Sequence, residues 1–510
     1  MLGAVRPSGA RRSWWLREAL AAETAAEGYL ATAAPPLRGT VTADVVIVGG
    51  GYTGMWTALR ITDLEPGARV VIVESDICGG GPSGRNGGFI TNWWDEFPTL
   101  LERYGLDGAR AVGDAMEAAV DEIGAYCAAS GIDAWYTKRG SVTASAAPAQ
   151  DGGWMPAVEA LQAHELGDRL VPLSAAEVRS RVASPVFRGG VFMPGAATIQ
   201  PAALARGLRR VLLERGVVIA EGTTATEIDG QRPGLLGGLG AGTRRAPSRR
   251  GGDRGLRPVR VRTTSADGEG EVLAGAAVVA LNAWAAAWPW FGRRLVTWSS
   301  YIVLTEPIPD RLVDLGWTGG EGVADARFTL HYLRTTPDGR IALGGGGGRA
   351  GFGGTIGSAF TDDVGDVRRA AAGLRRLFPS LADVRIEDGW GGPIDISADH
   401  LPWFGTIPGR PIHYGHGYSG NGVGPSLVGG RILAAKALER ASDPALVLPL
   451  ADGRQPRRFP PEPARYIGAR LIREAAVRRE TREERGEDPG FMLREMSRLP
   501  RRIGYHLGPD

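Results

Sequence analysis

The sequence contains little cysteine and little lysine. Its two cysteines, Cys78 and Cys127, lie far apart among 510 residues and form no metal or redox motif. This usage excludes a scaffold built on several disulfides and favours a reducing compartment. The only lysines are Lys138 and Lys436, which limits the residues that can supply an amine in catalysis.

Long apolar runs and a strong charge bias are absent as well. The formal net charge is only +3 and no basic tract stands out, so nucleic-acid binding is not predicted. The nearest candidate for a membrane span, residues 274–291, is interrupted by Asn282 and Pro289. The six histidines are scattered without paired ligand spacing, so no metal is predicted.

The N-terminal segment, residues 1–42, carries an Arg-Arg pair at 11–12 that superficially resembles a twin-arginine export signal. The hydrophobic core of such a signal is missing, because the charged residues Arg17 and Glu18 interrupt the stretch after the arginine pair. We therefore predict an amphipathic arm that packs on the body of a cytoplasmic protein.

A short β-branched run leads directly into a glycine-rich turn. Residues 45–48 have the composition of a strand buried on both faces, as at the centre of a parallel sheet. Gly49 then permits a tight turn, Gly51 lets the backbone approach a pyrophosphate, and Gly54 lets a helix pack on the strand. That helix, predicted over 52–64, would direct its N-terminus at the phosphates.

A second predicted strand, residues 69–73, ends at Glu74, where a carboxylate can accept hydrogen bonds from a ribose diol. A second glycine-rich loop comes directly after it, over 78–88. A nicotinamide-binding domain has no need of this loop, whereas a flavin dinucleotide needs backbone beside its pyrophosphate and toward its ring. The sequence therefore predicts a flavin dinucleotide site.

Two glycine-rich motifs and three downstream segments form a characteristic set. They span residues 45–54, 83–88, 194–208, 223–228 and 278–284. This set resembles the glycine/D-amino-acid oxidase superfamily of FAD-dependent amine oxidoreductases, and is most similar to its gamma-glutamylputrescine oxidase and aminophosphonate oxidoreductase branches. The resemblance covers almost the entire chain.

The resemblance implies an α/β fold, with a Rossmann-like FAD-binding domain of the glutathione-reductase type. This domain would be interleaved with an α+β substrate domain built on a largely antiparallel sheet, which includes a hairpin of strands at 330–334 and 340–344. The expected FAD-binding segments are 43–100, 186–290 and 398–445, and the expected substrate-domain segments are 101–185 and 291–397.

Two further segments are expected outside these domains. Residues 230–258 are rich in Gly and Arg and predict a loosely held insertion. Residues 446–510 predict a helical tail, in which a helix over 466–485 docks through one apolar stripe. The stripe consists of Ile467, Leu471, Ile472 and Ala475.

The expected cofactor site combines the fingerprint, the second loop, two downstream turns and a late loop before a helix predicted over 425–439. Backbone N–H groups of that loop would face the pyrimidine end of the flavin. The candidate residues are Gly49, Gly51, Tyr52, Thr53, Gly54, Glu74, Ser75, Ser83, Gly84, Arg85, Asn86, Gly87, Gly88, Ala225, Asn282, Gly420, Asn421, Gly422, Val423 and Gly424.

Substrate contacts are expected from aromatic and basic side chains near the ring. The candidates are Trp93, Tyr301, Tyr332, Arg334 and Trp390. No catalytic residue can be assigned from the sequence; His416, Tyr332 and Arg334 are candidates, and for His416 a structural role is favoured.

The resemblance implies hydride transfer to flavin N5 from the carbon next to a primary or secondary amine, giving an imine that hydrolyses. Polyamines, N-alkyl amino acids and aminoalkylphosphonates are the expected substrate classes. Non-covalent FAD is implied, because no His lies in or just before 83–88 and no Cys lies in the C-terminal block. The electron acceptor, O2 or another molecule, and the oligomeric state stay open. The alternatives are an FAD-dependent dehydrogenase of a hydroxy acid or polyol phosphate, and a non-catalytic flavin-binding protein.

Overall fold

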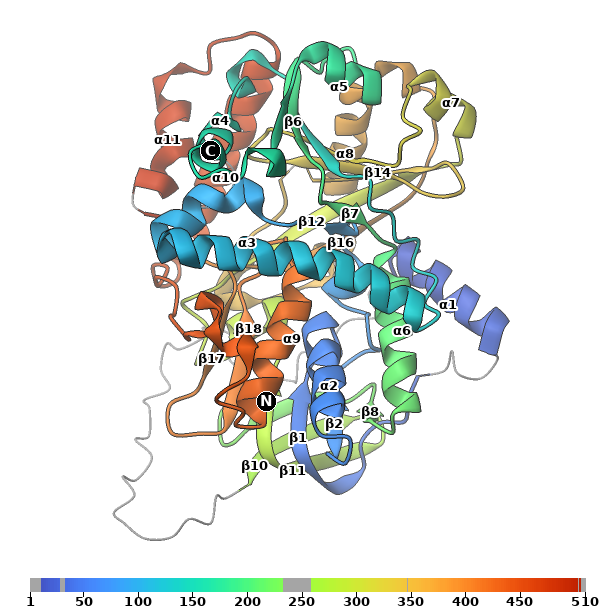
Figure 1. Ribbon diagram of the computed structural model, residues 1–510, viewed down its shortest axis with the longest axis vertical. Helices are drawn as coiled ribbons and strands as arrows, with labels where there is room; N and C mark the ends of the chain where they lie inside the picture. Colours follow the sequence, from blue (N-terminus) through green and yellow to red (C-terminus); the bar gives the residue numbers. More distant parts are fainter. Residues whose placement is uncertain (1–10, 28–32, 233–257, 346, 503, 506–510) are drawn as a thin grey trace.

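The computed structural model describes residues 11–27, 33–232, 258–345, 347–502 and 504–505. Most of the predicted insertion, residues 233–257, lies outside the described residues. Two eight-stranded sheets organise the molecule, one in the lower and one in the upper half of Figure 1.

The first sheet has the strand order β17-β18-β11-β1-β2-β8, with β9 and β10 joined to it through β11. Its centre is parallel, with Val46 opposite Val71 in adjacent strands. All four residues of β2 are buried, as the apolar composition predicts. The strands are β1 (Gly39–Val48), β2 (Val70–Val73), β8 (Val218–Ala220), β9 (Thr224–Ile228), β10 (Val259–Ser265), β11 (Gly268–Val279), β17 (Trp403–Thr406) and β18 (Ile412–His416).

Three helices complete the Rossmann-like half: α2 (Tyr52–Leu64), α6 (Pro201–Glu214) and α9 (Val423–Ala437). Helix α2 begins and ends where the sequence predicts. The long helix α3 (Phe97–Ala129) packs beside α9 and crosses the molecule between its two halves (Figure 1).

The second sheet has the strand order β16-β12-β15-β14-β13-β4-β6-β5 and is largely antiparallel. The predicted hairpin is confirmed, because β14 and β15 pair with Leu333 opposite Leu343. The strands are β4 (Ser141–Ser145), β5 (Val171–Leu173), β6 (Gly189–Met193), β12 (Val296–Thr305), β13 (Gly322–Asp325), β14 (His331–Thr335), β15 (Ile341–Gly345) and β16 (Ile386–Ile396).

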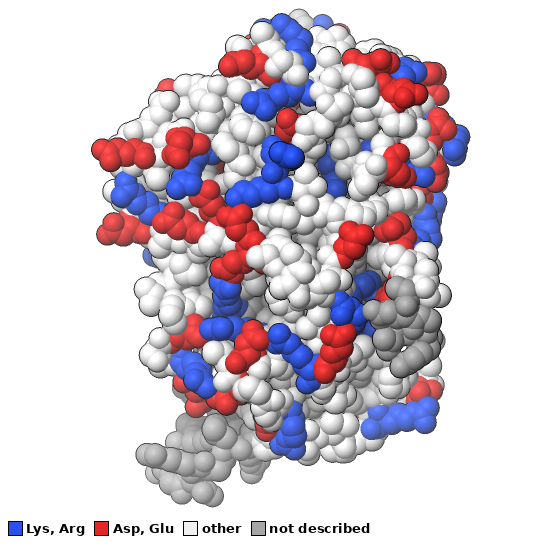
Figure 2. All heavy atoms as spheres, turned by 45° about the vertical axis from the view of Figure 1, so that its right-hand side comes forward, with Lys and Arg blue, Asp and Glu red and all other residues white. Residues whose placement is uncertain are grey.

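The remaining elements surround these sheets. The helices are α1 (Trp14–Glu27), α4 (Met155–Gln162), α5 (Ala175–Arg181), α7 (Pro309–Asp314), α8 (Val364–Leu377), α10 (Ala464–Glu484) and α11 (Gly490–Arg502). Strands β3 (Phe89–Ile90) and β7 (Ala197–Thr198) form a separate antiparallel pair. Within the described ranges, no helix has the length and apolarity that crossing a membrane requires. On the face shown in Figure 2, acidic and basic side chains are interspersed.

Two expectations about segment boundaries and packing are wrong. Strand β6 falls within the expected FAD-binding segment 186–290, but it pairs with β4 and β5 in the second sheet. Helix α10 docks through only part of the predicted stripe, because Ala475 is buried but Ile467 and Leu471 are 51% and 53% exposed. The charged Glu480 is also buried, which a hydrophobic pattern cannot identify.

The N-terminal arm is a helix that joins the two halves. The Ser13 hydroxyl donates to the carbonyl oxygen of Gly84 in the second glycine-rich loop, at 2.6 Å. Arg12 donates to the Asp76 carboxylate at 2.8 Å, just beyond β2. Arg11 forms an ion pair of 2.5 Å with Asp388, which belongs to β16 of the second sheet. The N-terminal arm therefore contacts both the second glycine-rich loop and the substrate-side sheet.

Candidate functional site

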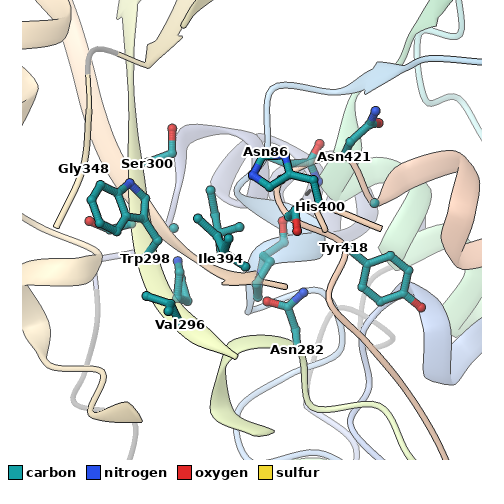
Figure 3. Close-up of a pocket in the computed structure, with 18 of the residues that line it drawn as sticks. Asn86, Asn282, Val296, Trp298, Ser300, Gly348, Ile394, His400, Tyr418 and Asn421 are labelled. Atoms are coloured by element: carbon teal, nitrogen blue, oxygen red, sulfur yellow. Dashed lines mark hydrogen bonds between the residues drawn. The ribbon is translucent and has the colours of Figure 1, made fainter. Parts of the chain in front are cut away.

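A cavity of about 1380 Å³ lies between the two halves, at the carboxyl ends of β1 and β2. This is where ligands bind in open parallel sheets. The volume exceeds the roughly 300–1,000 Å³ of a typical small-molecule pocket, so the cavity has room for a dinucleotide and a second ligand. Figure 3 shows Trp298, Val296 and Ser300 of the second sheet on one side, and Asn421 and Tyr418 on the other.

The glycine fingerprint forms the turn that the sequence predicts. Gly49 has a φ of +115°, and a Cβ there would lie 2.4 Å from the carbonyl oxygen of Ala280. A Cβ on Gly54 would lie 2.0 Å from the carbonyl oxygen of Gly49, so only glycine lets α2 pack this closely. Gly51 is the N-cap of α2 and faces Ser83, whose hydroxyl accepts from the Tyr52 N–H at 2.9 Å.

Glu74 lies at the end of β2 and lines the cavity. One carboxylate oxygen accepts from the Gly50 N–H at 2.7 Å and the other from the Asp76 N–H at 2.8 Å. Burial nevertheless raises the pKa of Glu74 to about 7, and these hydrogen bonds oppose the shift only in part. The carboxylate keeps acceptor capacity for a ribose diol in the cavity.

The second glycine-rich loop is fixed by the guanidinium of Arg85. It donates to the carbonyl oxygens of Gly80 at 2.9 Å, Gly391 at 3.2 Å and Arg11 at 3.0 Å. Burial lowers the pKa of Arg85 to about 10. Because its guanidinium N–H groups donate to carbonyl oxygens of the protein, Arg85 determines the shape of the loop. The backbone of the loop faces the cavity.

The late loop before α9 supplies a second helix N-terminus to the same cavity. The N-caps of α2 and α9 are Gly51 and Gly422, which have no side chain to cap the helix, although Ser83 accepts from the Tyr52 N–H of α2. The backbone N–H groups and dipole of such a start favour an anion. Tyr418 ties this loop to α2, because its hydroxyl hydrogen-bonds to that of Thr53 at 2.6 Å.

A buried carboxylate connects the late loop to the turn that follows β11. Asp395 on β16 accepts from the Asn282 side-chain amide at 2.9 Å and from the Gly417 N–H at 2.6 Å. Burial raises the pKa of Asp395 to about 7, although these hydrogen bonds lower it. Asn282 has a left-handed φ of 47° and points into the cavity region in Figure 3. Asp395 thus fixes the positions of two cavity-lining segments, those of Asn282 and Gly417, relative to each other.

The structure brings most predicted cofactor residues together on one cavity wall. Those that line it are Gly49, Gly51, Tyr52, Thr53, Glu74, Ser75, Ser83, Arg85, Asn86, Gly87, Ala225, Asn282, Gly420, Asn421, Gly422 and Val423. Gly54, Gly84, Gly88 and Gly424 lie behind the lining. A Cβ on Gly84 would meet the carbonyl oxygen of Gly79 at 2.2 Å, so these glycines permit close backbone packing.

Among the predicted substrate residues, only Tyr332 lines the cavity. Its hydroxyl hydrogen-bonds to Ser300 at 3.0 Å, and its ring packs against Phe89. The structure places the other four, Trp93, Tyr301, Arg334 and Trp390, in the interior outside the lining.

Each of these four side chains has a structural role. Arg334 donates to the carbonyl oxygens of Ile199 and Thr335, which leaves it turned away from the cavity. Trp390 donates to the carbonyl oxygen of Arg85 at 2.9 Å and so supports the second loop from behind. The Tyr301 hydroxyl donates to the Ala359 carbonyl, and Trp93 belongs to the core beneath α3. None of these four side chains lines the cavity, so the structure does not place them where a ligand in the cavity would contact them.

His416 is also outside the lining. Its ring packs 4.4 Å from Phe291 and close to Trp403 and Tyr414. Neither ring nitrogen has a hydrogen-bond partner among the described residues. Burial lowers the pKa of His416 to about 3, so the ring is neutral. This apolar setting agrees with a structural role and excludes direct contact with a ligand in the cavity.

Several residues of the cavity wall are not predicted from the sequence. Trp298, Ser300 and Ile394 come from β12 and β16, and His400 lies after β16 with a left-handed φ of 58°. The alternation of the strand residues along β12 and β16 is the only sequence signal that could have identified them as part of the cavity wall. Others come from segments before α3 and from the C-terminal helices; they are Asp95, Glu96, Ile472, Arg473, Leu499 and Arg501.

The observed cradle fits FAD. Two helix starts with glycine N-caps suit the pyrophosphate and the pyrimidine end of the ring, and Glu74 suits the ribose diol. Gly50 leaves no room for a side chain, because a Cβ there would lie 2.6 Å from the Cys78 sulfur. Ala225 and Thr226 line the cavity beyond Glu74, where the adenine would lie.

Comparisons with known proteins agree with this assignment. The gamma-glutamylputrescine oxidoreductase of Escherichia coli (strain K12) is 28% identical over 408 residues, which are 78% of this chain and 84% of that protein. The glycine oxidase of Geobacillus kaustophilus superposes with a TM-score of 0.60 at 20% identity, covering 80% of this chain and 98% of the other.

The L-proline dehydrogenase of P. horikoshii gives a TM-score of 0.60 at 18% identity, over 80% of this chain and 97% of the other. At these identities the structural likeness shows the fold alone. The family model described as FAD dependent oxidoreductase, DAO, matches residues 44–436. The chain therefore belongs to the DAO family of FAD-dependent oxidoreductases.

Proposed function

We propose that this chain oxidises a primary or secondary amine, with FAD bound non-covalently between the two sheets. Bound FAD would supply the two-electron acceptor for a hydride from the carbon next to the amine nitrogen, and the imine product would be hydrolysed by water. The relative named for gamma-glutamylputrescine supports an amine substrate, as do the carboxyl groups in the cavity wall.

The observation that carries the proposal is the acidic edge of the cavity. Asp95 and Glu96 line it directly before α3, and Glu102 lines it one turn into that helix. Burial raises the pKa of Glu96 to about 7, with a further contribution from neighbouring Asp95. Carboxyl groups in this position attract a cationic amine and oppose a purely anionic hydroxy acid or polyol phosphate.

The protein's own part is to position the substrate. Thr91 donates to the side-chain oxygen of Asn421 at 2.9 Å, which joins the acidic segment to the loop before α9. Tyr332 and Trp298 form the opposite wall from the second sheet. Tyr332 also packs against Gly87 of the second loop, where a Cβ would lie 2.6 Å from its ring. Substrate and cofactor walls are thus in direct contact, which favours a fixed reacting geometry.

The test is anaerobic bleaching of the flavin absorbance in the purified holoprotein. We expect reduction by members of a panel of polyamines, N-methyl amino acids and aminoalkylphosphonates. The double variant D95N/E96Q should need a roughly tenfold or higher amine concentration while its FAD content stays unchanged. Reduction by hydroxy acids or polyol phosphates alone, or by no compound, would overturn the proposal.

A further inference from the structure

The C-terminal hairpin formed by α10 and α11 is part of the cavity wall. It lies beyond residue 436, where the match to the family model ends. Ile472 and Arg473 of α10 line the same cavity as the glycine fingerprint, as do Leu499 and Arg501 of α11. The cavity wall is therefore built in part by a segment beyond the residues that the family model matches.

Buried ion pairs fix this hairpin to the substrate-side sheet. The Glu480 carboxylate accepts from the Arg327 guanidinium at 3.1 Å and from the Thr329 N–H at 3.1 Å. Glu484 of the same helix lies 3.2 Å from Arg327. Thr329 itself lines the cavity, in the loop between β13 and β14. The position of α10 is thus defined relative to the cavity.

Arg473 of α10 has no ion pair shorter than 3.4 Å among the described residues. It donates to the Gly347 carbonyl at 3.3 Å and to the partly exposed Glu474 at 3.4 Å. The buried carboxylate of Asp366 is 3.8 Å away and already accepts from Arg349 at 2.8 Å. The Nε of Arg473 has no hydrogen-bond partner among the described residues.

Two buried arginines of this region are paired more closely than the partly buried Arg473. Arg465 lies 2.7 Å from Glu462, and Arg327 lies 3.1 Å from Glu480. A guanidinium in a protein interior normally has such a carboxylate partner, because an unpaired buried charge is costly. Arg473 therefore has capacity for an anion that the described part of the chain does not supply.

Arg473 contacts the cavity wall that contains Gly348 and Trp298. Its acceptor Gly347 is next to Gly348, and Gly348 and Trp298 lie together on one side of the cavity in Figure 3. Trp298 and Ser300 are alternate residues of β12, and Ser300 hydrogen-bonds to Tyr332. A substrate that lies along β12 with its amine toward the flavin would extend its distal end toward Arg473.

We propose that Arg473 binds an anionic group of the substrate, so that the preferred substrates are amines carrying a distal carboxylate or phosphonate. This inference rests on the proposed amine oxidation. Arginine suits both anions because its planar guanidinium can donate two parallel hydrogen bonds. The acidic edge at Asp95 and Glu96 and the cation at Arg473 would then bind opposite ends of a zwitterion.

The test compares 4-aminobutyrate with n-butylamine as reductants of the flavin under anaerobic conditions. In R473Q the concentration of 4-aminobutyrate that gives half-maximal reduction rate should rise about 10- to 100-fold, whereas that of n-butylamine should change less than about threefold. R473K should lose less than R473Q. The matched control is R470Q, which removes an exposed arginine outside the cavity lining on the same helix.

Binding of butyrate can be measured without turnover, because a ligand next to the flavin changes the flavin absorbance. Its dissociation constant should also rise about 10- to 100-fold in R473Q and stay unchanged in R470Q. If R473Q does not retain flavin, the reductant and butyrate titrations are carried out on R473K, and their results decide whether the inference holds. Equal losses for both reductants, or butyrate binding independent of Arg473, would overturn the inference. Butyrate binding that depends on Arg473 in a protein that no amine reduces would overturn the proposed function alone.

Discussion

Replacing Glu74 by glutamine should weaken FAD binding and stabilise the FAD-free protein at the same time. Glu74 accepts from the Gly50 and Asp76 N–H groups and lines the cavity where the ribose would lie. Glutamine keeps the shape and one acceptor oxygen but cannot carry the charge. A hydrogen bond to a charged group contributes about 1.5–3 kcal/mol, so the dissociation constant for FAD should rise about 10- to 150-fold.

The effect on the FAD-free protein has the opposite sign. The pKa of Glu74 is raised from 4.5 to about 7, so the folded protein favours the protonated form. Its contribution to stability is therefore present below pH 4.5 and is lost as the pH rises to about 7. The full displacement corresponds to about 3 kcal/mol. E74Q should recover part of this at pH 8 as a higher thermal midpoint, because its amide has one acceptor oxygen for the two N–H groups that Glu74 binds.

The pH dependence of FAD binding provides the decisive assay. A ribose diol donates to the ionised carboxylate, so wild-type affinity should fall as the pH drops below about 7, by up to tenfold per pH unit. E74Q should show a flat profile between pH 8 and pH 5.5 in a fluorescence titration with FAD. The control is E214Q, which removes an exposed carboxylate of α6 outside the cavity lining. A profile in E74Q as steep as that of the wild type would refute this assignment of Glu74.

Three further outcomes can be checked with single variants. Gly54→Ala places a Cβ 2.0 Å from the Gly49 carbonyl oxygen, so this variant should lose roughly 1–3 kcal/mol of stability and most of its FAD, measured by thermal unfolding and flavin content. Glu480→Ala leaves the buried Arg327 without its closest carboxylate and should lose about 3–5 kcal/mol in denaturant unfolding; an unchanged midpoint would contradict the role of this pair. His416→Leu should change stability by less than about 1.5 kcal/mol and leave anaerobic flavin reduction unchanged, whereas a large loss of rate would contradict its structural assignment.

The dinucleotide half of the site could be predicted because its signals are local in the sequence. Gly49, Gly51 and Gly54 specify one turn, and Glu74 lies at the end of the next strand. The substrate half could not be predicted in the same way. Arg334 is on a predicted strand, yet its guanidinium turns to the Ile199 carbonyl, an arrangement set by a segment 135 residues away.

The C-terminal helix shows a second reason for failure. The apolar pattern predicts Ile467 and Leu471 on the docking face, but both are half exposed. The helix is instead held through Glu480, and a buried carboxylate in a helix is indistinguishable in sequence from a solvated one. The contribution of Arg473 to the cavity therefore depends on packing that the sequence pattern does not show.

The N-terminal helix has a practical consequence for work with shortened chains. A version trimmed to residues 44–436 would retain every fingerprint glycine yet lose α1 and the hydrogen bond from Ser13, just before α1, to the Gly84 carbonyl. The deletion would also uncover the apolar surface of Trp390 and Ala202, against which Trp15 packs. Trimming the chain to the matched residues would thus yield an aggregation-prone protein with a less well held second glycine-rich loop. Both chain ends therefore belong in any preparation meant for crystallisation or assay.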